Sequence, residues 1–159
     1  MKITIIAVGK IKEKFYRDAI DEYSKRLSKY CKLEIKEVAD EKTPDHASDT
    51  VNVQILTKEG ERIKNLIPKD SHVIVLAIEG RKYDSVEFAD MINNAGIHGI
   101  SNITFIIGGS LGIADEIKKS ANAAISFSDM TFPHQLMRVI LLEQIYRGYK
   151  IITKEPYHK

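Results

Sequence analysis

The sequence of 159 residues predicts an α/β fold, in which helices flank a parallel sheet. Apolar segments of strand length alternate with segments of helical period along the whole chain. The later strand segments are continuous apolar runs, which is typical of parallel strands covered on both faces. No internal repeat, low-complexity segment or linker divides the sequence, so residues 1–159 are expected to form a single domain.

Five segments have the length and composition of strands. The first is a short apolar run at the N-terminus, and the second alternates as a half-exposed strand does. The other three are apolar on both faces. In order, the predicted strands cover residues 2–8, 31–38, 72–78, 103–107 and 123–127.

Five further segments carry apolar residues three and four positions apart, which is the helical period. Gly60 weakens the second, Asp84 or Ser85 caps the third, and Pro133 opens the last and longest. The predicted helices cover residues 12–30, 51–66, 85–94, 114–120 and 133–150. The polar segment 39–50 contains Pro44 and is expected to form a mobile loop.

Composition limits the class of protein. Apolar residues make up 43% and charged residues 29%, the balance of a water-soluble globular protein. The net charge of +2 does not indicate nucleic-acid binding, although a local basic patch would suffice for it. The single cysteine, Cys31, excludes an internal disulfide framework and a cysteine-based metal cluster. We therefore expect a cytoplasmic protein with no signal peptide, no membrane span and no metal.

Two strand ends carry residues that suit a ligand site. Residues 108–112 (Gly-Gly-Ser-Leu-Gly) follow a strand, so their backbone N–H groups can face a ligand. They also suit a tight turn, and they match neither the dinucleotide fingerprint nor a Walker A loop. Glu79, at the end of the preceding strand, can bind a ribose hydroxyl, hold a neighbouring loop or be solvated.

The segment from Phe127 to His134 combines apolar and polar residues in a loop. Phe127, Met130 and Phe132 supply apolar walls, and hydrogen-bonding side chains lie between them. A flat aromatic ligand fits such a slot. The alternative interpretation is that these apolar residues hold the loop onto the core.

The last helix and the tail form a second group of candidates. Glu143 and Arg147 lie four residues apart and can pair on one helix face. Residues 156–159 (Pro-Tyr-His-Lys) are either a frayed end or a contact to RNA through stacking and phosphate pairing. Val139 and Leu142 lie off the apolar face of the helix, which predicts a dimer interface.

The chain resembles the bacterial ribosomal RNA large subunit methyltransferase H family. The resemblance spans the whole sequence and is carried by the opening segment 2–10, the Ile107-Gly108-Gly109 turn, residues 127–134 and the terminal Tyr157-His158-Lys159. It implies a SPOUT-type fold with a deep C-terminal trefoil knot. It also implies a homodimer that uses S-adenosyl-methionine to methylate N3 of a pseudouridine in 23S ribosomal RNA, on assembled ribosomes.

The resemblance also assigns site residues. By match to the family's motif, the expected cofactor contacts are Leu76, Gly108, Phe127, Ser128, Asp129, Met130, Thr131 and Phe132. The candidate catalytic residues are Glu143, Arg147, Tyr157 and His158. Glu143, His158 and solvent are the candidate bases for the imide proton, and the tail is expected to complete the site of the partner protomer.

Two variants follow from these expectations. Gly108→Arg should fill the pocket and abolish cofactor binding while leaving the fold largely intact. Deletion of residues 156–159 should leave thermal stability and cofactor affinity nearly unchanged, whereas methyl transfer to ribosomes should collapse. Two other functions remain open: a non-catalytic RNA- or nucleotide-binding module with a Rossmann-like sheet, and a small NAD-dependent oxidoreductase. The late position of the glycine loop counts against the oxidoreductase.

Overall fold

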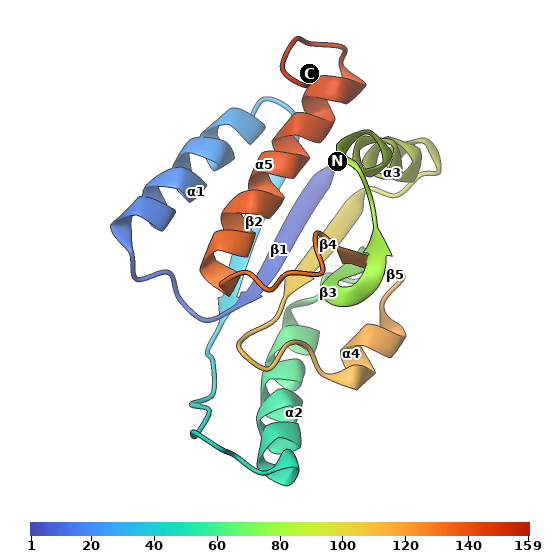
Figure 1. Cartoon of the computed structure of the whole chain (residues 1–159). Helices are drawn as coiled ribbons and strands as arrows, with labels where there is room; N and C mark the ends of the chain where they lie inside the picture. Colours follow the sequence, from blue (N-terminus) through green and yellow to red (C-terminus); the bar gives the residue numbers. More distant parts are fainter.

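A five-stranded parallel sheet forms the centre of the computed structural model, which describes residues 1–159 (Figure 1). Its strand order is β2-β1-β4-β3-β5. The strands are β1 (Lys2–Val8), β2 (Lys32–Val38), β3 (His72–Lys82), β4 (Asn102–Ile107) and β5 (Ala123–Ser126). The helices are α1 (Lys14–Leu27), α2 (Asp49–Leu66), α3 (Ser85–Ile97), α4 (Asp115–Ser120) and α5 (His134–Ile152). The predicted α/β class is confirmed.

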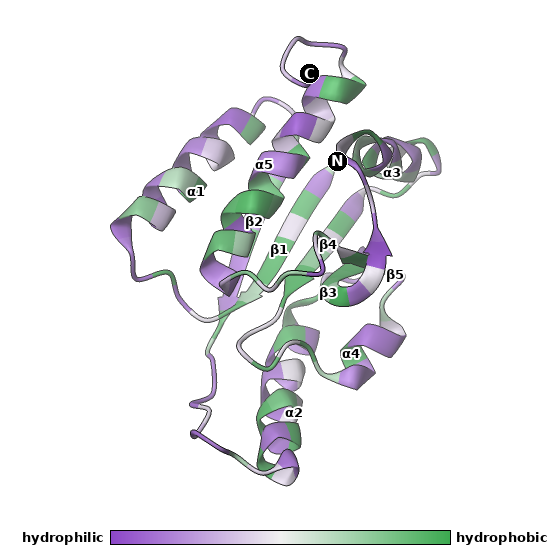
Figure 2. Cartoon of the chain, viewed as in Figure 1, coloured by the Kyte–Doolittle hydropathy of each residue, from purple (hydrophilic) through white to green (hydrophobic).

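Two apolar cores cover the two faces of the sheet. The larger core joins the sheet to α1, α3 and α5, and the smaller core joins it to α2 and α4. Strand β1 serves both, because Ile3 and Ile5 face the larger core and Ile6 and Val8 face the smaller one. Figure 2 shows both hydrophilic and hydrophobic bands along α1 and α2, as expected of helices that bury one face.

The predicted elements are all present, with shifted ends. Helix α1 is shorter than predicted, because residues 9–13 form the connection from β1 and residues 28–30 turn into β2. Strand β3 runs four residues beyond its predicted end at Ile78, with an irregular register against β5 between Leu76 and Arg81. The apolar run ends where the strand leaves the core, but its backbone pairing continues.

Local chemistry explains the glycine in α2 and the start of α3. A Cβ atom on Gly60 would lie 3.1 Å from the Cβ of Ala114, so this glycine lets α2 approach the segment that leads into α4. Asp84, rather than Ser85, caps α3. Its side chain accepts the Glu87 N–H at 2.8 Å, and the Glu87 side chain accepts the Asp84 N–H at 2.9 Å, which is a capping box.

Helix α5 corrects one step of the dimer argument. Leu142 is fully buried in the larger core, so it does not call for a second burial partner. Leu136, Val139 and Ile140 remain only partly buried. No helix of the structure combines the length and apolar character needed to cross a membrane. The strand order does not trace the knot, and the trefoil knot stays a prediction.

Candidate active site

The carboxyl ends of β3, β4 and β5 meet around a cavity of about 390 Å³. These strands are neighbours in the sheet, so the loops that follow them lie side by side. Among the predicted cofactor contacts, those that line the cavity are Leu76, Gly108, Phe127, Ser128, Met130, Thr131 and Phe132. Asp129 does not line it; its carboxylate lies 2.5 Å from the Lys82 ammonium, at the surface.

The glycine loop is both a tight turn and a close-approach site. The Gly112 N–H donates to the Gly109 carbonyl at 3.0 Å, and Gly112 has a φ of +85°, which favours glycine. A Cβ atom on Gly108 would collide with the Gly112 carbonyl. Any side chain at Gly108 therefore forces the loop itself to shift, and the expected loss of cofactor binding in Gly108→Arg stays a prediction.

Different residues of the loop after β5 hold the loop onto the core and line the cavity, which are the two roles predicted for them. Phe127 packs on Phe88 of α3, with ring centroids 6.1 Å apart, so it does hold the loop to the core. Met130 is 74% exposed, although it lines the cavity. The Ser128 hydroxyl accepts the Met130 N–H at 3.0 Å and fixes the turn between them.

The rim of the cavity holds an ion pair that joins β3 to α4. Glu79 accepts a hydrogen bond from Lys118 at 2.7 Å, and this bond lowers the pKa of the Glu79 carboxyl. Both residues line the cavity. Glu79 therefore holds a neighbouring element, which was one of its predicted roles. Lys118 was missed, because nothing in the sequence relates α4 to the end of β3.

His134 brings a titratable ring to the other side of the cavity, at the start of α5. Burial, followed by the nearby Arg138 cation, lowers the pKa of its imidazole, which favours the neutral form. Arg138 is 3% exposed; it donates to Glu37 at 2.6 Å and to the Gly9 carbonyl at 3.2 Å. The start of α5 is thereby tied to the carboxyl ends of β1 and β2.

A second cluster gathers all four candidate catalytic residues near the end of α5. Arg147 donates to Glu143 at 2.6 Å, and the Tyr157 hydroxyl donates to the same carboxylate at 3.2 Å. The Arg147 guanidinium lies 4.7 Å from the Tyr157 ring centroid and 3.3 Å from His158 Nδ1. Burial raises the pKa of the Tyr157 hydroxyl, with the Glu143 carboxylate adding to the effect.

The tail is anchored and not frayed. The Tyr157 ring meets Tyr146 edge-on at 5.0 Å between centroids, and Tyr146 belongs to the larger core. Glu155 accepts hydrogen bonds from Lys150 and Tyr30, both at 2.8 Å. The expectation that deleting residues 156–159 removes no core contact is therefore wrong.

Within one chain the second cluster does not reach the cavity. Glu143 and Arg147 follow His134 by 9 and 13 residues, which at a rise of about 1.5 Å per residue is roughly 14 and 20 Å along α5, and none of the four catalytic candidates lines the cavity. His134 is at one end, and the C-terminus lies beyond the other (Figure 1). The structure brings the catalytic candidates together with one another, but not with the cofactor candidates.

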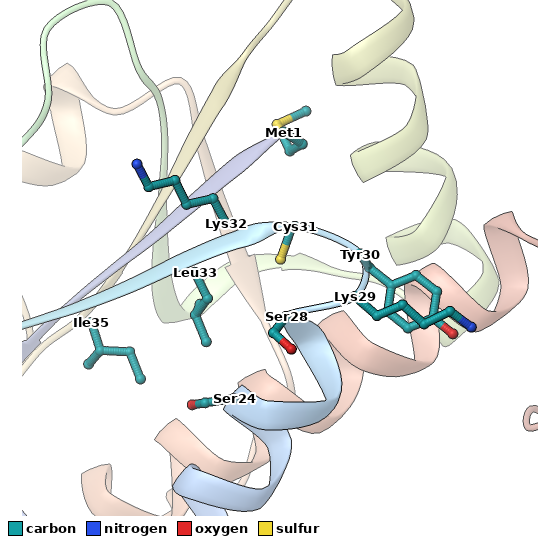
Figure 3. A pocket seen from close by; sticks show the side chains of 9 residues that line it. All are labelled: Met1, Ser24, Ser28, Lys29, Tyr30, Cys31, Lys32, Leu33 and Ile35. Atoms are coloured by element: carbon teal, nitrogen blue, oxygen red, sulfur yellow. The ribbon is translucent and has the colours of Figure 1, made fainter.

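A larger hollow of about 830 Å³ lies between α1 and β2. Its two lysines do not converge on a common point: Figure 3 shows Lys29 extending along Tyr30 and Lys32 pointing away from it. Lys29 also lies 3.5 Å from the Glu155 carboxylate. Burial raises the pKa of the Cys31 thiol to about 11, which keeps it protonated. We therefore place the candidate site at the strand ends.

Comparison with known proteins shows the family of the chain. A family model described as "Predicted SPOUT methyltransferase" matches residues 1–158. The chain is 65% identical over 159 residues, the full length of both proteins, to the ribosomal RNA large subunit methyltransferase H of Bifidobacterium adolescentis. It is 60% identical, again over both full lengths, to the putative ribosomal RNA large subunit methyltransferase H of Methanococcus maripaludis.

A solved structure shares the fold. A probable methylase family protein from Haemophilus influenzae aligns with a TM-score of 0.53 and 11% identity, over 99% of this chain and 70% of that one. The family resemblance is thereby confirmed: the chain belongs to the SPOUT methyltransferases and, within them, to the ribosomal RNA large subunit methyltransferase H family.

Proposed function

We propose that the protein uses S-adenosyl-methionine to methylate N3 of a pseudouridine in 23S ribosomal RNA, on assembled ribosomes. The observation that carries the proposal is the cavity at three adjacent strand ends, in a chain whose full-length relatives are named for ribosomal RNA methylation. Residues 1–159 would act as one domain, because β4 pairs with both β1 and β3 and so joins all five strands in a single sheet. Ribosomes as substrate imply a cytoplasmic enzyme.

The cavity suits the proposed cofactor in size and lining. Its volume falls within the range of small-molecule sites, and its walls combine apolar side chains with backbone groups. Leu76, Phe127 and Phe132 would enclose the adenine, and the glycine loop would bring backbone groups close to the ribose and the amino-acid part. When bound, the cofactor would supply a methyl group carried on a sulfonium. After transfer of this group, the rest of the cofactor would leave as a neutral thioether.

The second cluster fits the acceptor side of the reaction. Arginine is only a donor, so its contact with His158 Nδ1 makes that nitrogen the acceptor and leaves the proton of the neutral ring on Nε2. His158 is then a donor to a uracil oxygen, where negative charge develops as the N3–H proton departs. Glu143 already accepts bonds from Arg147 and Tyr157, so it holds the cluster in place. The proton would go to solvent.

The separation of the two clusters favours a composite site in a homodimer. Because the tail packs against the second half of α5 and does not line its own cavity, it would serve the cavity of a second copy. The half-buried Leu136, Val139 and Ile140 on α5 would supply apolar contacts between the copies. A two-fold arrangement would place each tail at the partner's cavity and form two equal sites.

The test is transfer of labelled methyl from S-adenosyl-methionine to purified ribosomes, followed by mass analysis of the nucleosides. We expect 3-methylpseudouridine in 23S RNA, and no transfer to ribosomes from cells that lack the pseudouridine synthase for that site. Transfer to an ordinary uridine would contradict the proposed acceptor. RNA binding without any transfer would favour the non-catalytic module instead.

A further inference from the structure

An exposed aromatic residue lies among cations where β1 turns into α1. Phe15 is 65% exposed, and its ring lies 4.4 Å from that of Tyr16, which is half-buried and supports it. Lys10 and Lys12 precede it in the connection, and both are exposed. The cofactor cavity and the tail cluster use none of these residues. We call residues 10–17 the β1–α1 corner.

The outer surface of the corner is cationic. Lys10 and Lys12 form no ion pair, whereas Lys14 pairs with Asp18 at 2.7 Å. Glu13 follows Lys12 in the sequence but forms no ion pair with it or with Lys10, and its Oε2 atom is shielded from solvent. Arg17 donates to the Lys12 carbonyl at 2.8 Å and so shapes the connection.

The corner is continuous with the cofactor cavity. A Cβ atom on Gly9, the residue before the corner, would lie 3.7 Å from His134 Nε2, and His134 lines the cavity. Figure 1 shows the β1–α1 connection at the same end of the sheet as the start of α5. An extended polymer whose target group enters the cavity would therefore pass across or beside the corner.

We infer that the β1–α1 corner binds an unpaired stretch of ribosomal RNA next to the target nucleotide, an inference that rests on the proposed function. Phe15 stacks on a base, and Lys10 and Lys12 contact phosphates. A flat exposed ring beside free lysines suits single-stranded RNA, because stacking accepts any base and the cations follow the backbone. Protein interface cores, in contrast, are depleted of lysine.

Two variants test the two kinds of contact. Phe15→Ala should weaken binding of a short single-stranded RNA and raise the KM for ribosomes by roughly 5- to 100-fold, whereas Phe15→Tyr retains both. The double variant K10Q/K12Q should reduce the salt dependence of RNA binding, by about 1.4 in the slope of log K against log salt. Affinity for S-adenosyl-methionine should not change in either.

The matched control is K32Q/K69Q. Lys32 opens β2 and Lys69 precedes β3, so both are at the amino ends of the strands, opposite the cavity, and both are exposed without an ion pair. This control should bind RNA with the wild-type salt dependence. An equal loss in the control and the corner variants would show that only net charge matters and would overturn the inference.

Other outcomes separate this inference from the proposed function. If the wild-type protein methylates ribosomes and Phe15→Ala does so with an unchanged KM, the corner does not bind RNA. If Phe15→Ala sediments as a monomer while the wild type is a dimer, the corner is a subunit contact and the inference is overturned. If the wild type transfers no methyl group but its RNA binding still depends on Phe15, the proposed function fails and the corner stands.

Discussion

The two ends of helix α5 are built in opposite ways. At its start, His134 joins a cavity lined largely by backbone groups and apolar side chains, and a buried arginine ties this end to the sheet. Along its second half, from the middle of the helix onward, Glu143, Arg147 and Tyr157 form a network of charged and aromatic side chains near the surface. The first end suits holding a small molecule, and the second suits contacting a polar acceptor.

This difference indicates that the two parts of the helix have separate functions, cofactor binding and nucleotide recognition. A site can hold a cofactor through its shape and its backbone groups, and it then needs few charged side chains. Recognition of a nucleotide requires donors, acceptors and a stacking ring, and these are the groups at the second end. A rigid helix keeps the two functions a fixed distance apart, and in the proposed dimer one copy would supply each of them.

The largest expected effect tests that division at its second end. Arg147→Ala removes the cation that orients Glu143 and His158, so methyl transfer to ribosomes should fall by a factor on the order of 10²–10³. Affinity for S-adenosyl-methionine, measured by calorimetry, should remain at the wild-type value. Arg26→Ala breaks a comparable i,i+4 pair on α1 and should affect neither. A parallel loss of cofactor binding in Arg147→Ala would show that the two ends are not separate.

Mixed dimers test whether the two ends act across copies. Gly108→Ala should disable the cavity, because the added Cβ displaces the glycine loop. Arg147→Ala disables the second cluster. When equal amounts of the two inactive variants exchange subunits, about one quarter of wild-type transfer should return, because half of the dimers then hold one complete site. If the mixture stays inactive after exchange is verified by mass analysis, each chain must supply both parts of its own site.

The sequence predicts the sheet well because burial alone determines it. The apolar runs of residues 103–107 and 72–78 became β4 and the core part of β3, as period and composition indicate. The neighbouring loops after β3, β4 and β5 follow from the rule for parallel sheets. Burial does not determine where β3 stops pairing, so its extension to Lys82 was missed.

The tail and the rim of the cavity were harder to predict. Tyr157 packs on Tyr146 because the chain turns back after α5. No local sequence pattern predicts that turn. Asp129 was assigned to the cofactor by motif alone, but its partner Lys82 lies 47 residues away in the sequence. The burial of Arg138 could have been predicted from the sequence. This arginine lies on the apolar side of its helix with Leu141 and Leu142, and an arginine in that position is expected to form a buried ion pair.

The anchored tail makes a smaller, structural effect measurable. Deleting residues 156–159 removes the contact between Tyr157 and Tyr146, and should lower the free energy of unfolding by about 1–3 kcal/mol. The corresponding fall in Tm, followed by circular dichroism, is roughly 3–10 °C. Deleting only residues 158–159 keeps Tyr157 and should leave Tm near the wild-type value, while methyl transfer falls in both variants. Equal Tm values for the two truncations would mean that Tyr157 contributes no stability.

The smallest expected effect concerns the pH dependence of the same anchor. Hydrogen bonds from Lys150, Tyr30 and Thr153 lower the pKa of the Glu155 carboxyl from 4.5 to about 2. Because the folded-state pKa is the lower one, the stabilisation is present above pH 4.5 and is lost as the pH falls toward 2. The Tm difference between the wild type and Glu155→Gln should therefore be largest near neutral pH and shrink through that window. Glu61→Gln, at an exposed site without an ion pair, should track the wild type throughout. A difference for Glu155→Gln that persists unchanged at low pH would show that the ionised carboxylate does not hold the tail to α5.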